Sequence, residues 1–327
     1  MKNSYQKYID LVEKAIRLTP TKRSIEVGVK TPKTSKETSE RLPVMILDPN
    51  DEIIELNISQ SLIKEMFFKG DKKEYCPKRL YHTTIIKDIP REETLAMSKG
   101  NFFETLVLGS SANGGQTLDL PRKKNNEKTI DQVRIEEQID MFPEICKRYG
   151  IIIIKDGVNC NVQRKFRKEI ELDRNFKIFL TMTWDIITPY KYGEIAKDAA
   201  IVDIKLTKTV HSDYQPYCWG MPHMMDHIQA FVYSFASGLP FAYLVFDYKS
   251  TEREHKFIPV NTDVNHPDRK KAKEALARKT EMFEVIRKAC TDIETYHRVG
   301  WHTEPNYYNC KDCPILDCVD KNKNQEI

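Results

Sequence analysis

The spacing of apolar residues along the chain predicts alternating helices and strands. Apolar positions three and four residues apart indicate amphipathic helices, whereas short apolar or alternating runs indicate strands. Helices are predicted over residues 5–18, 62–68, 91–109, 129–150, 224–238 and 267–297. Strands are predicted over residues 44–56, where a turn divides two of them, and over 151–157, 158–163, 176–188, 199–207, 241–249 and 254–260. This order of elements predicts a mixed α/β core.

Single residues mark the ends of several predicted helices. Ser59 or Ser61 can cap the N-terminus of the helix over 62–68, and Gly109 is suited to end the helix over 91–109. Pro143 is expected to interrupt the helix over 129–150, because proline lacks a backbone N–H.

Length and composition limit the domain organisation. The chain has 327 residues, of which 40% are hydrophobic, which is enough for one large domain with insertions or for two modest domains. Residues 19–43 are rich in Lys, Thr, Ser and Pro and are expected to form a linker or long surface loop. We therefore predict an N-terminal helix and linker over 1–45 and a folded domain over 46–327.

Charge and hydropathy limit the classes of function. The formal net charge of +4 is too small to indicate nucleic-acid binding by itself. No apolar run is long enough to span a membrane, and the N-terminus lacks the apolar centre of a signal peptide. A cytoplasmic location is expected, where cysteines are thiols or metal ligands rather than disulfides.

The strand over 199–207 carries charged residues within an apolar run. Because side chains alternate along a strand, Val202 and Ile204 share one face, and Asp203 and Lys205 share the other. Burying such a pair costs several kcal/mol unless partners satisfy it. The pair therefore indicates either a functional site or a surface ion pair on a partly exposed edge strand, and the strand alone does not decide between them.

The preceding predicted strand also contains an isolated carboxylate, Asp185. If the two strands pair across the loop over 189–200, Asp185 and Asp203 converge. Two neighbouring carboxylates repel each other, and a divalent cation relieves this repulsion. Oxygen ligands favour Mg²⁺ or Mn²⁺.

The order Asp185, then Asp203-Ile204-Lys205, resembles the PD-(D/E)XK nuclease superfamily. Its RecB-like branch has an acidic or histidine ligand on an upstream helix, which Glu104 in GNFFE matches, and a Q-x-x-x-Y pair, which Gln229 and Tyr233 match. This sequence departs from the family motif at Trp184, where the motif has Pro, and in having Asp203 where Glu is common.

The resemblance implies a restriction-endonuclease-like core with a mixed central sheet flanked by helices. It also implies that Glu104, Asp185, Asp203 and the carbonyl of Ile204 hold Mg²⁺ or Mn²⁺. Lys205 would orient or help deprotonate the attacking water and contact the phosphate. Gln229 and Tyr233 would position the DNA backbone.

Three cysteines near the C-terminus, Cys310, Cys313 and Cys318, form a C-x₂-C-x₄-C pattern typical of metal ligands. Cys76 in YCPKRLYH resembles the N-terminal cysteine element of Cas-four-type and AddB-type nucleases, in which four such cysteines bind a 4Fe–4S cluster. Four thiolates also suit zinc, and four unrelated thiols are a further alternative. Lys78 and Arg79, beside Cys76, are predicted DNA contacts.

These features together predict a metal-dependent DNA exonuclease of recombination, repair or spacer processing. The chain has no phosphate-binding P-loop, so a helicase or recombination protein is expected to supply unwound DNA. The alternatives are a site-specific endonuclease of the same superfamily and a non-catalytic DNA-binding subunit.

Overall fold

The computed structural model describes residues 54–70, 76–89, 94–109, 120–173, 176–213 and 217–301. The predicted extension over 1–45, the first strand of the 44–56 pair, and Cys310, Cys313 and Cys318 lie outside the described residues.

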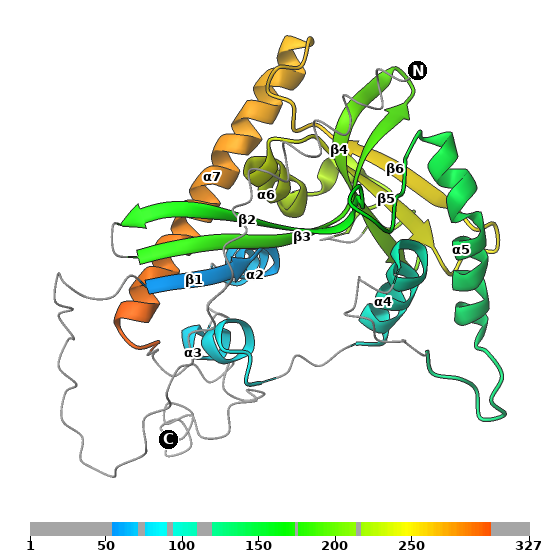
Figure 1. The fold of residues 1–327 in the computed structure, drawn as a ribbon, viewed down its shortest axis with the longest axis horizontal. Coiled ribbons are helices and arrows are strands. Elements are labelled where there is room, and N and C mark those ends of the chain that lie inside the picture. The colour runs from blue at the N-terminus through cyan, green and yellow to red at the C-terminus, as the bar shows by residue number, and fades with distance from the viewer. Residues whose placement is uncertain are drawn as a thin grey trace.

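A mixed sheet runs through the described part of the chain (Figure 1). Its strands are β1 (Ile54–Ser59), β2 (Val162–Asp173), β3 (Phe176–Tyr192), β4 (Ile195–Thr207), β5 (Phe241–Asp247) and β6 (His255–Val260). The β1–β3 and β4–β5 pairs are parallel, and the β2–β3, β3–β4 and β5–β6 pairs are antiparallel.

The long strand β3 joins two halves of the sheet. Strand β1 pairs with residues 176–181 of β3, and β4 pairs with residues 186–192. Strand β2 pairs with β3 from Phe176 to Ile186, and therefore lies along the other edge. On the edge of β3 that faces β1 and β4, residues 182–185 lie in an opening. This opening runs from the end of β1 to the point where β4 stops pairing with β3, although β4 itself continues to Thr207. Figure 1 shows the two groups of strands extending in different directions from this region.

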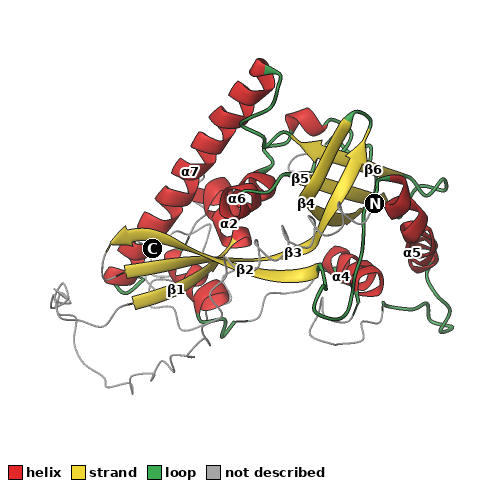
Figure 2. Ribbon diagram, turned by 45° about the horizontal axis from the view of Figure 1, so that its top comes forward, coloured by secondary structure: helices red, strands yellow, loops and turns green. Residues whose placement is uncertain are grey.

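Helices cover both faces of the sheet (Figure 2). The helical elements are α2 (Gln60–Gly70), α3 (Pro77–Leu80), the π-helical turn η1 (Tyr81–Ile85), α4 (Leu95–Leu108), α5 (Ile130–Arg148), the 3₁₀ turn η3 (Pro222–Met224), α6 (Ile228–Ser237) and α7 (Arg269–Arg298). One hydrophobic core contains buried residues of α2, α6 and α7, and a second contains buried residues of α4 and α5. The predicted mixed α/β fold is thus confirmed.

Local sequence accounts for several element boundaries. The Ser59 hydroxyl accepts a hydrogen bond from the Leu62 N–H at 3.2 Å and so caps α2. Gly109 ends α4 with φ +106°, a conformation that favours glycine. Val202 and Ile204 of β4 are buried in the core beneath α4 and α5, as the alternation predicts.

Several element predictions were wrong because tertiary contacts override local signals. The strand predicted over 158–163 is one of them, since only its last two residues belong to β2, which continues to Asp173. Pro143 lies inside a continuous α5, since Phe142 and Ile145 bury the helix on both sides of it and outweigh one missing hydrogen bond. The run over 151–157 is not a strand. Its Ile152 and Ile154 N–H groups are instead satisfied by the side chains of Thr188 and Asn161, both at 2.7 Å.

Two further boundaries also differ from the predictions. The expected loop over 189–200 is a hairpin whose strands meet at Tyr192 and Ile195, with Gly193 at φ +58° in the turn. Pro189 is accommodated by a register shift in β3. Helix α6 begins at Ile228 rather than four residues earlier, because His227 takes a left-handed conformation with φ +54°.

Candidate active site

Asp185 and Asp203 meet at the opening in the sheet. The last pair of the β3–β4 ladder at this end is Ile186 with Val202, so Asp185 and Asp203 are the next residue on each strand. The ladder ends there because the Ile204 N–H donates to Asp185 Oδ2 at 2.7 Å instead of to a β3 carbonyl. Both carboxylates are buried, with Asp185 8% and Asp203 1% exposed.

Glu104 reaches the same place from α4, on the opposite side of the sheet from α6. The side chain of Gln163 in β2 joins it to Asp185, because its Nε2 donates to Glu104 Oε1 at 2.7 Å and to Asp185 Oδ1 at 3.5 Å. Gln163 has φ +49°, an uncommon conformation for a non-glycine residue that is often found at functional sites. Gln163 is not among the site residues that the sequence predicts, since neither its residue type nor its spacing indicates that conformation.

Lys205 and Gln229 fix the orientation of Asp203. The Lys205 ammonium forms an ion pair with Asp203 Oδ2, and Gln229 Nε2 donates to Asp203 Oδ1 at 2.6 Å. The Lys205 side chain is 29% exposed whereas that of Asp203 is 2% exposed, so the amine lies on the solvent side of the carboxylate.

Tyr233, one helical turn after Gln229, contacts backbone rather than a carboxylate. Its hydroxyl donates to the Thr183 carbonyl at 3.2 Å, within the segment of β3 that lies between β1 and β4. Tyr233 therefore satisfies a strand carbonyl beside the site. The structure brings Glu104, Asp185, Asp203, Lys205 and Gln229 together, and places Tyr233 beside them.

The carboxylates of the site destabilise one another's charged forms. Burial, followed by the charges of Asp203 and Glu104, raises the pKa of Asp185 well above its usual range. Burial also raises the pKa of Asp203 and of Glu104. For Lys205, burial acts to lower the pKa, but the charges of Asp203 and Asp185 outweigh it and raise the pKa. Lys205 therefore stays protonated at neutral pH.

The carboxylate oxygens of the site are the type of ligand that a hard divalent cation prefers. Burial raises the pKa of all three carboxyl groups, and a bound cation would offset the cost of keeping them ionised. In the described residues, no three His, Cys, Asp or Glu side chains converge as direct ligands of one ion. The Gln163 amide bridges Glu104 and Asp185 through its two hydrogen bonds.

The other predicted site residues lie on α3 or outside the described residues. Cys76 precedes α3, which contains Lys78 and Arg79; Arg79 is exposed, and Cys76 and Lys78 are half-buried. The rings of Tyr81, just after α3, and Trp301, just after α7, stack with centroids 5.0 Å apart. Tyr81, five residues after Cys76, therefore lies beside Trp301, which is nine residues before Cys310 in the sequence.

Comparisons with known proteins identify no family. No family model matches this sequence, and no curated protein matches it. Among solved structures, the chain is similar to a crystal structure of a protein from Eubacterium rectale that carries the name "Putative exonuclease". The sequence identity is 17%, the similarity covers 72% of this chain and 82% of that chain, and the TM-score is 0.40. At this identity and TM-score, the similarity does not indicate an activity for this chain.

No helix in the described part of the chain combines the length and apolar character needed to cross a membrane.

Proposed function

We propose that the protein is a metal-dependent deoxyribonuclease, and specifically an exonuclease that hydrolyses phosphodiester bonds in DNA. The observation that carries the proposal is the meeting of three carboxylates and a protonated lysine at the opening in the sheet. Burying this much charge is unfavourable for folding and is characteristic of functional sites.

The side chains divide the work of such a site among them. Lys205, held as an ammonium ion beside Asp203, donates hydrogen bonds to a phosphate oxygen or to the attacking water. Gln229 fixes Asp203, and Gln163 holds Glu104 toward Asp185. This arrangement orients the acidic groups before substrate binds.

Glu104, Asp185, Asp203 and the Ile204 carbonyl would hold Mg²⁺ or Mn²⁺. Such an ion, when bound, lowers the pKa of water and stabilises negative charge on the scissile phosphate. Burial raises the pKa values of the three carboxyl groups, and carboxylate repulsion adds to this at Asp185 and Glu104; binding of the ion would relieve both costs.

Digestion of end-labelled DNA tests the proposal. Linear single-stranded, linear duplex and circular DNA are incubated with the full-length protein and Mg²⁺, Mn²⁺ or EDTA. We expect cleavage of linear DNA from its ends, dependent on the metal. Asp203→Ala and Lys205→Ala should each reduce the rate about 100-fold or more, as loss of a catalytic group does.

Two exposed residues on the same strands provide matched controls, Asp198→Ala in β4 and Lys191→Ala in β3. Both should retain the wild-type rate. Nicking or linearisation of circular DNA would favour a site-specific endonuclease. Full activity in both site variants would refute the assignment, and binding without any cleavage by the wild type would favour a non-catalytic DNA-binding subunit.

We also propose that Cys76, Cys310, Cys313 and Cys318 bind a 4Fe–4S cluster, with zinc as the alternative. The stacking of Tyr81 on Trp301 supports a common location, because it brings together the two segments that lead to these cysteines. Purified protein should show a broad absorbance near ~400 nm, together with iron and acid-labile sulfide. Colourless protein with one equivalent of zinc would instead favour the zinc site.

A helicase or recombination protein that supplies unwound DNA is the proposed partner. A pull-down with the purified protein tests this, with Asp203→Ala used to trap the shared DNA substrate.

A further inference from the structure

Three aromatic rings form a row from the molecular surface to the candidate active site. Tyr217 stacks on Trp219 with centroids 5.6 Å apart and an interplanar angle of 18°, and Trp219 meets the edge of Tyr243 at 5.3 Å. Tyr243 is the β5 neighbour of Asp203 in the parallel β4–β5 register. Tyr217 is 45% exposed, whereas Trp219 and Tyr243 are buried. The row therefore begins beside Asp203 and ends at an exposed tyrosine ring.

A lysine from α2 accompanies this exposed ring. Lys64 Nζ donates to the Tyr217 hydroxyl at 2.9 Å and lies 4.3 Å from the ring centroid. The Lys64 ammonium and a Tyr217 ring that is 45% exposed thus lie together at the outer end of the aromatic row.

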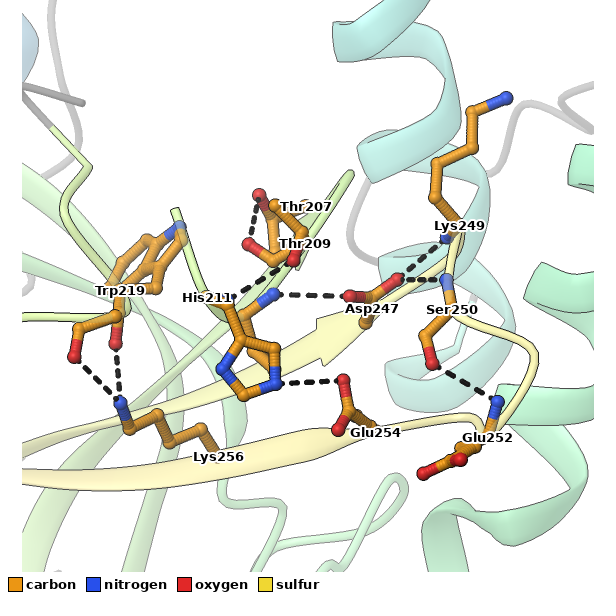
Figure 3. A network of polar contacts seen from close by, with 12 residues as sticks. Thr207, Thr209, His211, Trp219, Asp247, Lys249, Ser250, Glu252, Glu254 and Lys256 are labelled. Atoms are coloured by element: carbon orange, nitrogen blue, oxygen red, sulfur yellow. Dashed lines mark hydrogen bonds and ion pairs between the residues drawn. The ribbon is translucent and has the colours of Figure 1, made fainter. Parts of the chain in front are cut away.

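The loop that carries Tyr217 and Trp219 is held firmly from β6. Lys256 Nζ donates to the Trp219 carbonyl at 2.6 Å (Figure 3). Gly220 leaves no room for a side chain, because a Cβ atom there would lie 2.7 Å from the His211 carbonyl oxygen. These contacts hold Trp219, against which the Tyr217 ring stacks.

The start of the same loop is fixed by Asp247. Its carboxylate accepts hydrogen bonds from the N–H groups of Lys249 and Ser250 (Figure 3) and from the Val210 N–H. A platform fixed before the ligand arrives loses little entropy on binding.

We propose that Tyr217 and Lys64 form a binding site for one nucleotide of single-stranded DNA, with the base stacked on the Tyr217 ring and the adjacent phosphate bound by Lys64. This inference rests on the proposed function and names residues that deliver the strand to it. Stacking needs an unpaired base with a free face, and a phosphate needs a cation nearby. An intact duplex offers the phosphates but not the base faces along its length, so the site selects a single strand.

Fluorescence anisotropy in EDTA tests this, because binding is then measured without cleavage. The probe is a labelled single-stranded oligodeoxynucleotide, compared with the same strand made abasic and with a blunt-ended duplex hairpin. Tyr217→Ala should weaken binding of the normal strand about 5- to 100-fold, the range for loss of one stacked base. Tyr217→Phe should bind like the wild type, because it keeps the ring.

Lys64→Met should weaken binding of both the normal and the abasic strand. It should also reduce the slope of log Kd against log salt by about 0.7, the value for one phosphate contact on a single strand. The matched control is Tyr192→Ala, which removes another exposed tyrosine, 43% exposed, at the far end of β3. This variant should bind normally.

Specific outcomes would overturn the site. Wild-type affinity in Tyr217→Ala would do so, as would an equal loss on the normal and abasic strands, because the ring would then not contact a base. An equal dependence of the blunt hairpin on Tyr217 would also contradict single-strand selection. Cleavage by Asp203→Ala in Mg²⁺ is measured in parallel. If that variant cleaves normally while Tyr217 is required for binding, the proposed catalytic site fails and the nucleotide site stands.

Discussion

Replacing Asp185 with asparagine should stabilise the metal-free protein at neutral pH while abolishing cleavage. Asp185 is buried, and Asp203 and Glu104 add to the effect of burial in raising its pKa. An asparagine oxygen can still accept the hydrogen bond that the Ile204 N–H donates at 2.7 Å. The substitution therefore removes the repulsion and keeps the contact that ends the β3–β4 ladder.

The effect must depend on pH in a definite direction. A carboxyl group whose pKa is raised on folding destabilises the folded state once the pH exceeds its unfolded-state pKa, and the penalty is complete above its folded-state pKa. Each unit of pKa elevation costs about 1.4 kcal/mol. Because asparagine packs and hydrogen-bonds imperfectly in place of a carboxylate, we expect a net gain of about 1–2 kcal/mol at about pH 8 and a smaller gain at about pH 5.

Urea unfolding in EDTA at both pH values measures this gain. Asp198→Asn, an identical change at an exposed position in β4, should leave stability within about 0.5 kcal/mol of the wild type. Asp185→Ala should lose stability, because the Ile204 N–H is then left without its acceptor. Added Mn²⁺ should stabilise the wild type more than Asp185→Asn. A destabilised asparagine variant at about pH 8, or a gain equal at both pH values, would refute the reasoning.

Three further predictions test other parts of the structure. Gln163→Asn should raise the Mn²⁺ concentration for half-maximal thermal stabilisation about 10- to 100-fold. Asparagine tolerates the left-handed backbone but is too short to join both carboxylates. An unchanged midpoint would show that Gln163 does not position Glu104. Asp247→Ala should lower the free energy of unfolding by about 2–4 kcal/mol in urea titrations, since three backbone N–H groups lose their acceptor. Pro143→Ala should raise that free energy by about 1–2 kcal/mol by restoring a hydrogen bond within α5, and a loss of stability would contradict the continuous helix.

The sequence predicted the site best where one local rule decided the outcome. Alternation along β4 correctly separated Val202 and Ile204 from Asp203 and Lys205, because only one face of that strand packs on α4 and α5. The pairing of β3 with β4 then brought Asp185 to Asp203 as expected.

Other features depend on contacts between distant segments and leave no local signal. Gln163 in β2 has a positive φ, and its side chain donates hydrogen bonds to both Glu104 and Asp185. Asn161 similarly provides hydrogen bonds that a strand partner would have made to the segment over 151–157. Its amide donates to the Ile152 and Ile187 carbonyls at 2.8 and 2.7 Å. Such side chains look like ordinary polar residues until the fold brings their partners to them.

The opening in the sheet links the fold to the proposed chemistry. A continuous β3–β4 ladder would direct the Ile204 N–H to a β3 carbonyl and would leave Asp185 without this donor. With the ladder ended, Asp185 accepts that bond, and the Tyr233 hydroxyl satisfies the Thr183 carbonyl. Strands β3 and β4 can then separate without leaving the Ile204 N–H or the Thr183 carbonyl unsatisfied. Glu104 reaches the opening from α4, on the other face of the sheet. Asp185, a proposed ligand of the cation, therefore also satisfies the Ile204 N–H where the ladder ends, which is why asparagine and alanine at position 185 should change stability in opposite directions.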